Sequence, residues 1–305
     1  RSCRETVSEI TFENTYDAKG SMSLSATKTL NGVAPADEAF SFVLKDAADG
    51  KEIETVANDA SGKVTFKAIN YTLSDVGKTF TYTISEVIPE GADKNVYNGT
   101  TYDATVYTVT VTPVDNGDGT ITATPSYTIG SDEAKEVTFA NTYSAEGKVD
   151  FSASKTLNGK APAADAFKFE LKDEKGTVLD TASNAADGSV DFKEIKYTLA
   201  DAGNTYKYTI SEVNEGKSGY TYDGTVYTYS VKVEDGGDGT LKITKTGDAD
   251  VAAFANTYAA NGSLTLEANK TLNGNAPKDG QFTFTLTGDG QNQTKTNDAT
   301  GHVQF

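Results

Sequence analysis

Three lysines occur at positions of the sequence where a buried apolar residue is expected. Lys28 falls on the apolar face of the alternating segment 22–30, and Lys155 and Lys270 occupy the same place in two further copies of that segment. A β-strand with this alternation buries one face, so the lysine shares the buried face. Because a buried amine is costly unless a partner compensates its charge, each lysine needs a partner in the core.

A glutamate and an asparagine show the same inward phase and are the candidate partners. In the phrase Tyr-Thr-Ile-Ser-Glu, which ends at Glu86 and again at Glu212, the glutamate shares its face with the tyrosine and the isoleucine. In the phrase Phe-x-Asn-Thr-Tyr, the asparagine shares its face with the phenylalanine and the tyrosine, as at Asn141 and Asn256. Lysine opens each repeat and asparagine closes it, so the two can meet if the first and last strands of a sandwich lie side by side.

These three residue types can form an amide cross-link. Burial disfavours both charged forms, so the pKa of the amine falls, the pKa of the carboxylic acid rises, and a proton can pass from one to the other. The neutral amine can then attack the asparagine carboxamide carbon, while the acid polarises the carboxamide oxygen and relays a proton to the departing ammonia. The alternative is a buried Lys-Glu ion pair with the asparagine as a hydrogen-bond partner.

The repeated phrases divide the chain. The phrase Lys-Thr-Leu-Asn-Gly recurs after 127 residues (155 − 28) and again after 115 residues (270 − 155), which are the sizes of ordinary domains. We therefore expect complete domains at 17–143 and 144–258, the last strand of a preceding domain at 1–16, and the N-terminal part of a following domain at 259–305. The unpaired motif residues of the two end segments are Asn14 and Lys270.

Short strands and tight turns are expected within each repeat. The Asp- and Gly-rich segments 115–120 and 235–240 lie between alternating runs and are typical of antiparallel hairpins, although their Asp spacing also faintly resembles a calcium loop. Many such strands in a domain of this size favour an immunoglobulin-like sandwich. The predicted fold class is therefore all-β, with tandem immunoglobulin-like β-sandwich domains.

The three phrases together resemble those of the pilin isopeptide-linkage domains of Gram-positive bacteria, which occur in major pilins and in the stalks of cell-wall adhesins. The resemblance covers both complete repeats and the two end segments. It implies spontaneous intramolecular isopeptide bonds between Lys28 and Asn141 and between Lys155 and Asn256. Glu86 would assist the first bond, and Glu212 would assist the second.

Composition excludes several classes of function. The 27 basic and 44 acidic residues give a formal charge of −17, which disfavours nucleic acids and anionic membranes as partners. No apolar run is long enough to span a membrane, and we expect no signal peptide in this segment. Cys3 is the only cysteine and His302 the only histidine, so no internal disulfide, His-based metal site or His-dependent catalytic triad is expected. We expect neither a cofactor nor a metal.

The leading prediction is a structural stalk or pilus-shaft segment at the bacterial cell surface. Its partners would be adjacent domains of a longer chain, with a sortase-linked pilin or the cell wall as further partners. The alternative is a ligand-binding adhesin module for a host protein or glycan, but its loops offer only Tyr97, Tyr102 and Tyr222, which we expect to pack as strand residues. A turnover enzyme is not expected, since paired acids such as Asp37 and Glu38 are typical of solvated surface; cross-linking would be a single turnover.

Overall fold

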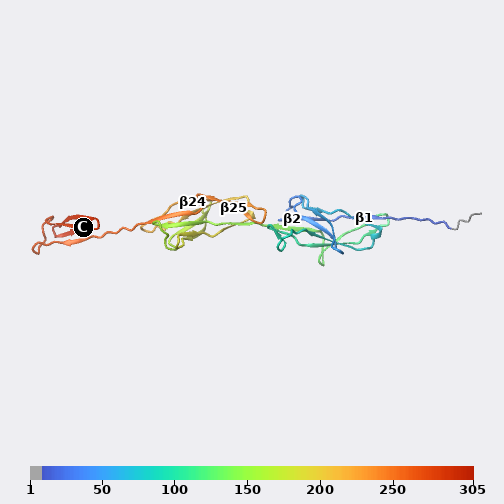
Figure 1. Ribbon diagram of the computed structural model, residues 1–305, viewed down its shortest axis with the longest axis horizontal. Helices are drawn as coiled ribbons and strands as arrows, with labels where there is room; N and C mark the ends of the chain where they lie inside the picture. The colour runs from blue at the N-terminus through green and yellow to red at the C-terminus, as the bar shows by residue number, and fades with distance from the viewer. Residues whose placement is uncertain (1–8) are drawn as a thin grey trace, which may run out of the picture.

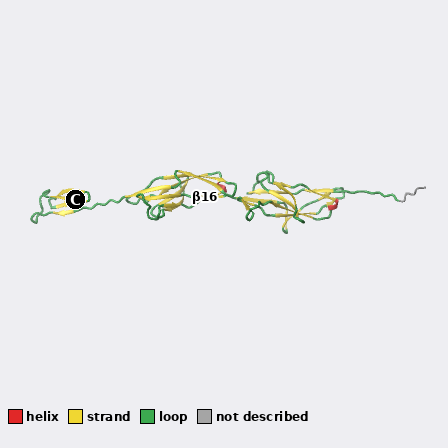
Figure 2. Cartoon of the chain, viewed as in Figure 1, coloured by secondary structure: helices red, strands yellow, loops and turns green. Residues whose placement is uncertain are grey.

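The computed structural model describes residues 9–305 and is built almost entirely of β-strands (Figures 1 and 2). Two sandwich domains follow one another along the long axis, and a smaller body lies beyond the second domain (Figure 1). The prediction of an all-β fold with tandem sandwich domains is confirmed. No helix among the described residues is long and apolar enough to cross a membrane.

The first domain contains two main sheets that share one core. Its strands are β1 (Lys19–Met22), β2 (Ser25–Leu30), β3 (Ser41–Asp46), β4 (Glu52–Ala57), β5 (Lys63–Thr65), β6 (Ile69–Thr72), β7 (Phe80–Glu86), β8 (Val96–Tyr97), β9 (Thr100–Thr101), β10 (Val106–Val111), β11 (Val114–Asp115), β12 (Ile121–Thr122), β13 (Ser126–Ile129), β14 (Asp132–Ala134) and β15 (Thr138–Tyr143), with the 3-10 helix η1 (Leu73–Asp75). One sheet has the order β14-β13-β10-β7-β3-β4, and the other has the order β5-β2-β15-β9-β8.

The second domain repeats this plan with fewer strands. Its elements are β16 (Glu146–Val149), β17 (Ser152–Leu157), β18 (Lys168–Asp173), β19 (Val178–Ser183), β20 (Ser189–Asp191), β21 (Ile195–Thr198), η2 (Leu199–Asp201), β22 (Thr205–Glu212), β23 (Tyr220–Thr221), β24 (Val226–Asp235), β25 (Leu241–Gly247) and β26 (Ala252–Tyr258). The two main sheets have the orders β19-β18-β22-β24-β25 and β20-β17-β26-β23.

The strand that carries the lysine is the second of each domain, and it lies beside the last strand, which carries the asparagine; the first strands, β1 and β16, pair with β6 and β21 instead. In the first domain β2 pairs with β15, and in the second β17 pairs with β26; both pairs are parallel. The glutamate strands β7 and β22 belong to the other main sheet of each domain. Along β2, the buried positions are Ala26 and Lys28, and along β7 they are Tyr82, Ile84 and Glu86, so the predicted phase matches the burial.

The described side chains of the two end segments are more exposed than those of the two sandwich domains. Residues 9–16 are exposed and form no strand, so the assignment of 1–16 to a preceding domain stays a prediction; residues 1–8, with Cys3, lie outside the described residues. The C-terminal body contains β27 (Glu267–Asn269), β28 (Thr283–Gly288), β29 (Gln291–Thr296) and β30 (His302–Gln304) in two two-stranded sheets. Its predicted inward face is largely exposed, with Leu264 at 78%, because this segment contains no glutamate strand to cover it.

Candidate functional site

In the first domain, Glu86 lies between Lys28 and Asn141 and contacts both. Lys28 Nζ donates a hydrogen bond to Glu86 Oε2 at 2.9 Å, and Asn141 Nδ2 donates to Glu86 Oε1 at 2.7 Å. The parallel register of β2 and β15 sets Lys28 opposite Phe139 and Leu30 opposite Asn141. The side chains of Lys28 and Glu86 are fully buried. The structure therefore brings together the three residues that the sequence singled out.

The second domain repeats this geometry. Lys155 Nζ donates to Glu212 Oε2 at 2.8 Å, and Asn256 Nδ2 donates to Glu212 Oε1 at 2.7 Å. Leu157 lies opposite Asn256 in the parallel pair of β17 and β26. The side chains of Lys155 and Glu212 are both fully buried. The two domains differ in their loops, but each contains its own Lys-Glu-Asn triad with the same geometry.

The carboxamide oxygen of each asparagine faces a backbone donor rather than the glutamate. Asn141 Oδ1 accepts a hydrogen bond from the backbone N–H of Asp103 at 2.8 Å, and Asn256 Oδ1 accepts one from Asp223 at the same distance. An N–H donor at this point fixes the orientation of the amide, since the flipped amide would set two donors against each other. The glutamate was expected to polarise this oxygen; in the structure it contacts the amide nitrogen instead.

The aspartate side chains hold these donors in place. Asp103 accepts hydrogen bonds from the backbone N–H groups of Thr105 and Ala140, the latter on the asparagine strand. Asp223 does the same with Thr225 and Ala255. Sequence reasoning missed both aspartates because each lies in a loop, outside the alternating phrases. The signal that could have found them is the shared phrase Thr-Tyr-Asp, which precedes the long strand in both repeats.

Burial shifts the pKa values of both lysines and of Glu86 in the direction that favours their neutral forms. Desolvation lowers the pKa of Lys28 and of Lys155 below the usual value of an amine, although the neighbouring glutamate opposes this shift. Desolvation likewise raises the pKa of Glu86, against the opposing effect of Lys28. An amine with a lowered pKa is a better nucleophile near neutral pH, because more of it is unprotonated.

Aromatic rings cover the amines. Lys28 Nζ lies 4.6 Å from the centre of the Phe40 ring, and Tyr102 packs edge-on against the same ring. Asn58 is buried and fixes this cover, since its Oδ1 accepts the Phe40 backbone N–H at 2.8 Å. Lys155 has the same cover from Phe167, at 4.8 Å. The amines therefore meet carboxylate and ring atoms in a site that excludes water.

The family model for FctA, described as a Spy0128-like isopeptide-containing domain, matches residues 24–144 and 151–259. The chain belongs to this family. The matched ranges contain both Lys-Glu-Asn triads and no part of the C-terminal body. A comparison with curated protein sequences gives no match.

Solved structures of Gram-positive surface proteins are similar to this chain. The major pilin of Streptococcus pyogenes has 14% identity and a TM-score of 0.27, over 81% of this chain and 99% of that chain. The T-13 major pilin of the same organism has 16% identity and a TM-score of 0.26, over 81% and 100%. A B repeat unit of the collagen-binding surface protein of Staphylococcus aureus has 18% identity and a TM-score of 0.19, over 79% and 100%.

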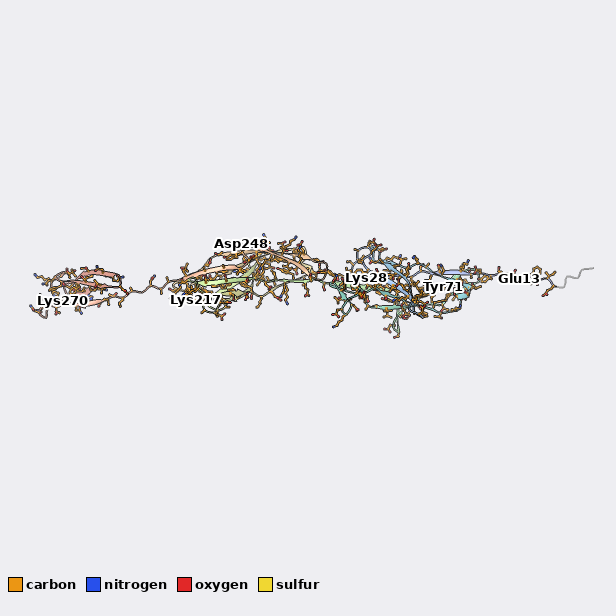
Figure 3. All side chains as sticks on the ribbon, in the orientation of Figure 1. Glu13, Lys28, Tyr71, Lys217, Asp248 and Lys270 are labelled. Atoms are coloured by element: carbon orange, nitrogen blue, oxygen red, sulfur yellow. The ribbon has the colours of Figure 1, made fainter. Side chains whose placement is uncertain are left out.

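The unpaired motif residues of the end segments lie apart from any triad. Lys270 follows β27 and is half-buried, with its Nζ 4.8 Å from the centre of the Phe282 ring, so this body keeps the lysine–aromatic contact of the complete isopeptide domains (Figure 3). Asn14 is exposed on the extended segment before the first domain, close in sequence to the labelled Glu13 (Figure 3).

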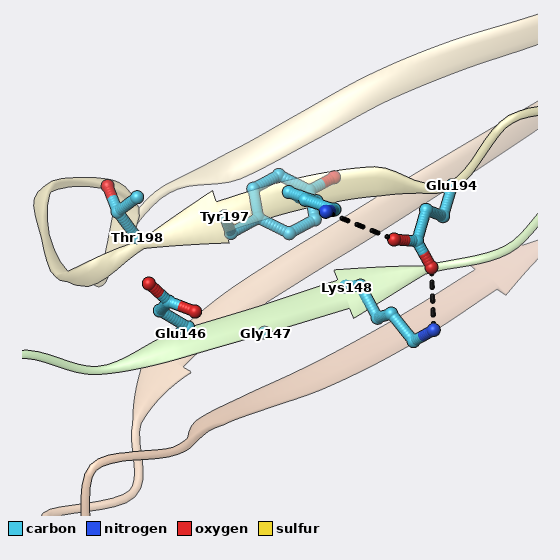
Figure 4. Close-up of a pocket in the computed structure, with 7 residues that line it drawn as sticks. Glu146, Gly147, Lys148, Glu194, Tyr197 and Thr198 are labelled. Atoms are coloured by element: carbon cyan, nitrogen blue, oxygen red, sulfur yellow. Dashed lines mark hydrogen bonds and ion pairs between the residues drawn. The ribbon is translucent and has the colours of Figure 1, made fainter. Parts of the chain in front are cut away.

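Outside the triads, the described surface shows no built reaction site. Asp37 and Glu38 are exposed, and no group of three or more His, Cys, Asp or Glu side chains within residues 9–305 could hold a metal ion. A groove of about 460 Å³ lies along β16 and β21, where Glu194 pairs with Lys148 at 2.6 Å and Lys196 at 3.4 Å (Figure 4). These charged groups already satisfy one another.

Proposed function

We propose that the chain is a tension-carrying segment of a Gram-positive surface protein, in which each complete domain is closed by an autocatalytic isopeptide bond. The bonds would join Lys28 to Asn141 and Lys155 to Asn256. The observation that carries this proposal is the bridging glutamate, which contacts the attacking and the leaving nitrogen with its two oxygens. Family membership supports a pilus-shaft or stalk role at the cell surface.

The chemistry follows from the contacts of one triad. Proton transfer from Lys28 to Glu86 gives a neutral amine and a neutral acid, and the amine nitrogen attacks Cγ of Asn141. The negative charge that develops on Oδ1 is stabilised by the Asp103 backbone N–H. Glu86 passes its proton to Nδ2 and takes up a proton from the attacking Lys28 nitrogen, the Cγ–Nδ2 bond breaks, and ammonia leaves while the new amide, with a single N–H, remains. Each triad reacts once, so this is cross-linking and not turnover.

The bond would change how force passes through the domain. Tension that enters at Lys28 would cross directly to Asn141, and the residues between them would carry none. β2 and β15 are parallel neighbours, so pulling on the two chain ends shears these strands in opposite directions. A covalent bond between them would prevent that shear. The partners we propose are neighbouring domains of the same protein, joined to other pilins or to the cell wall.

Intact mass of the purified chain tests the proposal. Each bond releases one ammonia, so we expect a deficit of about 34 Da for two bonds, and a cross-linked peptide pair from each domain after digestion. Glu86→Ala and Glu212→Ala should each recover about 17 Da of that deficit. Lys270→Ala is the matched control, since that lysine has no triad, and it should keep the full deficit. A wild-type mass without any deficit would leave only the ion pair.

A further inference from the structure

The tyrosine that closes the first domain inserts its hydroxyl into a turn of the second domain. Tyr143 OH donates a hydrogen bond to Asp235 Oδ1 at 2.5 Å and accepts one from the Gly239 backbone N–H at 3.4 Å. The turn 235–240 joins β24 to β25 and is one of the two Asp- and Gly-rich turns of the sequence. The hydroxyl is therefore held from two sides by the neighbouring domain.

The same contact occurs at the start of the first domain. Tyr16 closes the earlier copy of the phrase Phe-x-Asn-Thr-Tyr. Its OH donates to Asp115 Oδ1 at 2.7 Å and accepts from the Gly119 backbone N–H at 3.1 Å. The turn 115–120 thus receives a tyrosine as the turn 235–240 does, and its aspartate oxygens serve this contact and the turn backbone.

The joint between the two complete domains is closely packed. Ala18 and Ala145, each two residues after the tyrosine, are 1% and 2% exposed and belong to the core of the domain that follows. The β8–β9 turn of the first domain lies against the turn of the second, because a methyl group on Gly99 would overlap the Cα of Gly239. Ser144, in the connection, donates its backbone N–H to Gly99 O at 3.0 Å.

Among the described residues, the C-terminal body makes no such contact with the second domain. Residues 259–305 contain no Asp-Gly-Thr sequence, and the C-terminal body stands away from the second domain on an extended segment (Figure 1). Ala260, which corresponds to Ala145, is exposed, and the Tyr258 hydroxyl makes no hydrogen bond within the described part of the chain. The backbone N–H of Ala259 nevertheless donates to Gly219 O at 3.0 Å, as Ser144 does to Gly99 at the joint between the two complete domains.

We propose that the Asp-x-x-Asp-Gly-Thr turn is a receptor for the closing tyrosine of the preceding domain, and that this contact sets the angle between neighbouring domains. By the same geometry, the surface formed by Tyr258 and Gly219 fits the N-terminal face of a further domain that carries such a turn. The proposal does not require the isopeptide bonds. The tyrosine–turn contact would make the joints between tandem domains stiff, whereas the proposed isopeptide bonds would make each domain inextensible.

The protonation of the tyrosines agrees with this role. Burial and the hydrogen bond to Asp235 raise the pKa of Tyr143, and the hydrogen bond to Asp115 raises the pKa of Tyr16. Both hydroxyls therefore remain protonated donors at neutral pH. The donor is needed, since a phenolate would repel the aspartate.

The distance between the two domains tests the proposal. Spin labels on Lys51→Cys and Lys175→Cys, which replace exposed lysines in a Cys3→Ser background, report that distance by double electron–electron resonance. The unmutated joint should give one narrow distribution. Tyr143→Phe and Asp235→Ala should each raise the population of undocked arrangements roughly tenfold, as expected for the loss of a hydrogen bond to a charged group.

Two matched variants control for general effects. Tyr258→Phe removes a hydroxyl from the same phrase, and Asp115→Ala changes the same type of turn; both lie away from the measured joint and should leave the distribution narrow. Melting curves check that each variant is folded. The proposal is overturned if the unmutated joint is already broad, if Tyr143→Phe and Asp235→Ala leave it unchanged, or if the two controls broaden it equally.

Discussion

Removing one glutamate should make one domain extensible and leave the other closed. Glu86→Ala takes away the group that contacts both the amine and the amide nitrogen in the first domain, and Glu212→Ala does so in the second. We expect each variant to lose one bond, so that tension unfolds only the domain that carries the substitution. The unmodified chain should show no unfolding step from either complete domain.

The size of the step follows from the structure. A bond in the first domain encloses 113 residues (141 − 28), and a bond in the second encloses 101 (256 − 155). At about 3.4 Å per extended residue, less the roughly 8 Å between paired strand positions two residues apart, opening should release roughly 370 Å and 330 Å. The two domains can therefore be distinguished by the length of the step.

Single-molecule pulling on the full chain through its two ends measures these steps. Glu86→Ala should add one step of roughly 370 Å, and Glu212→Ala one of roughly 330 Å, each absent from the other variant. The connection from Asn141 to Lys155 has 14 residues (155 − 141), so it can release at most about 48 Å with the bonds intact. A step of full-domain length in the unmodified chain would refute the reasoning.

Three further predictions follow from the triad geometry. In equilibrium denaturation, Asn141→Ala should lower the free energy of unfolding of the first domain by about 4 to 5 kcal/mol, the worth of closing a loop of about 100 residues, whereas Asn14→Ala at an exposed position should have no measurable effect. Burial raises the pKa of Glu86 above its usual 4.5 and lowers the pKa of Lys28 below its usual 10.5, and Asn141→Ala, which cannot form the bond, should keep both groups buried and titratable. The folded state then binds more protons than the unfolded state just above pH 4.5 and fewer just below pH 10.5. The free energy of unfolding should therefore fall as the pH rises above 4.5 and recover toward 10.5, with its minimum between; a pH series of denaturation curves without a minimum would contradict this. Asp103→Ala loosens the N–H donor to Asn141 and should slow bond formation in the first domain by roughly tenfold, as followed by time-resolved mass, while leaving the rate in the second domain unchanged.

The inward phase of the triad could be predicted from sequence because strand alternation is local. Lys28, Glu86 and Asn141 each share a face with apolar neighbours, and period-two alternation assigns that face without any knowledge of tertiary contacts. The order of the motifs supplied the rest, since residues that open and close a sandwich domain meet when its terminal strands pair. The structure agrees with this expectation, because the lysine strand β2 pairs in parallel with the asparagine strand β15.

The source of polarisation at the carboxamide oxygen could not be predicted in this way. Asp103 acts through its backbone N–H, a group that every residue except proline carries, so the repeated phrase Thr-Tyr-Asp marks the position without revealing that it supplies the donor. The placement of Phe40 over the amine depends on Asn58, whose contacts span a loop. The burial expected for Lys270 is not complete, for another reason. Lys270 has the same phase as Lys28, but burial also requires a complete facing sheet, and the C-terminal body contains no glutamate strand.

The asparagine of the proposed bond and the tyrosine of the joint lie on the same strand, and this explains why the domains can differ in length. Asn141 and Tyr143 are two residues apart on β15, and Asn31, three residues after Lys28 in the opening phrase, exchanges two hydrogen bonds with the Tyr143 backbone. With the proposed bond in place, a path from lysine to asparagine to tyrosine would bypass the rest of the domain. The edge strand β14, which has no counterpart in the second domain, lies off that path. Changes in domain length there leave both the bond and the joint untouched, whereas the 14-residue spacing from asparagine to lysine lies on the path and is the same at 14–28, 141–155 and 256–270.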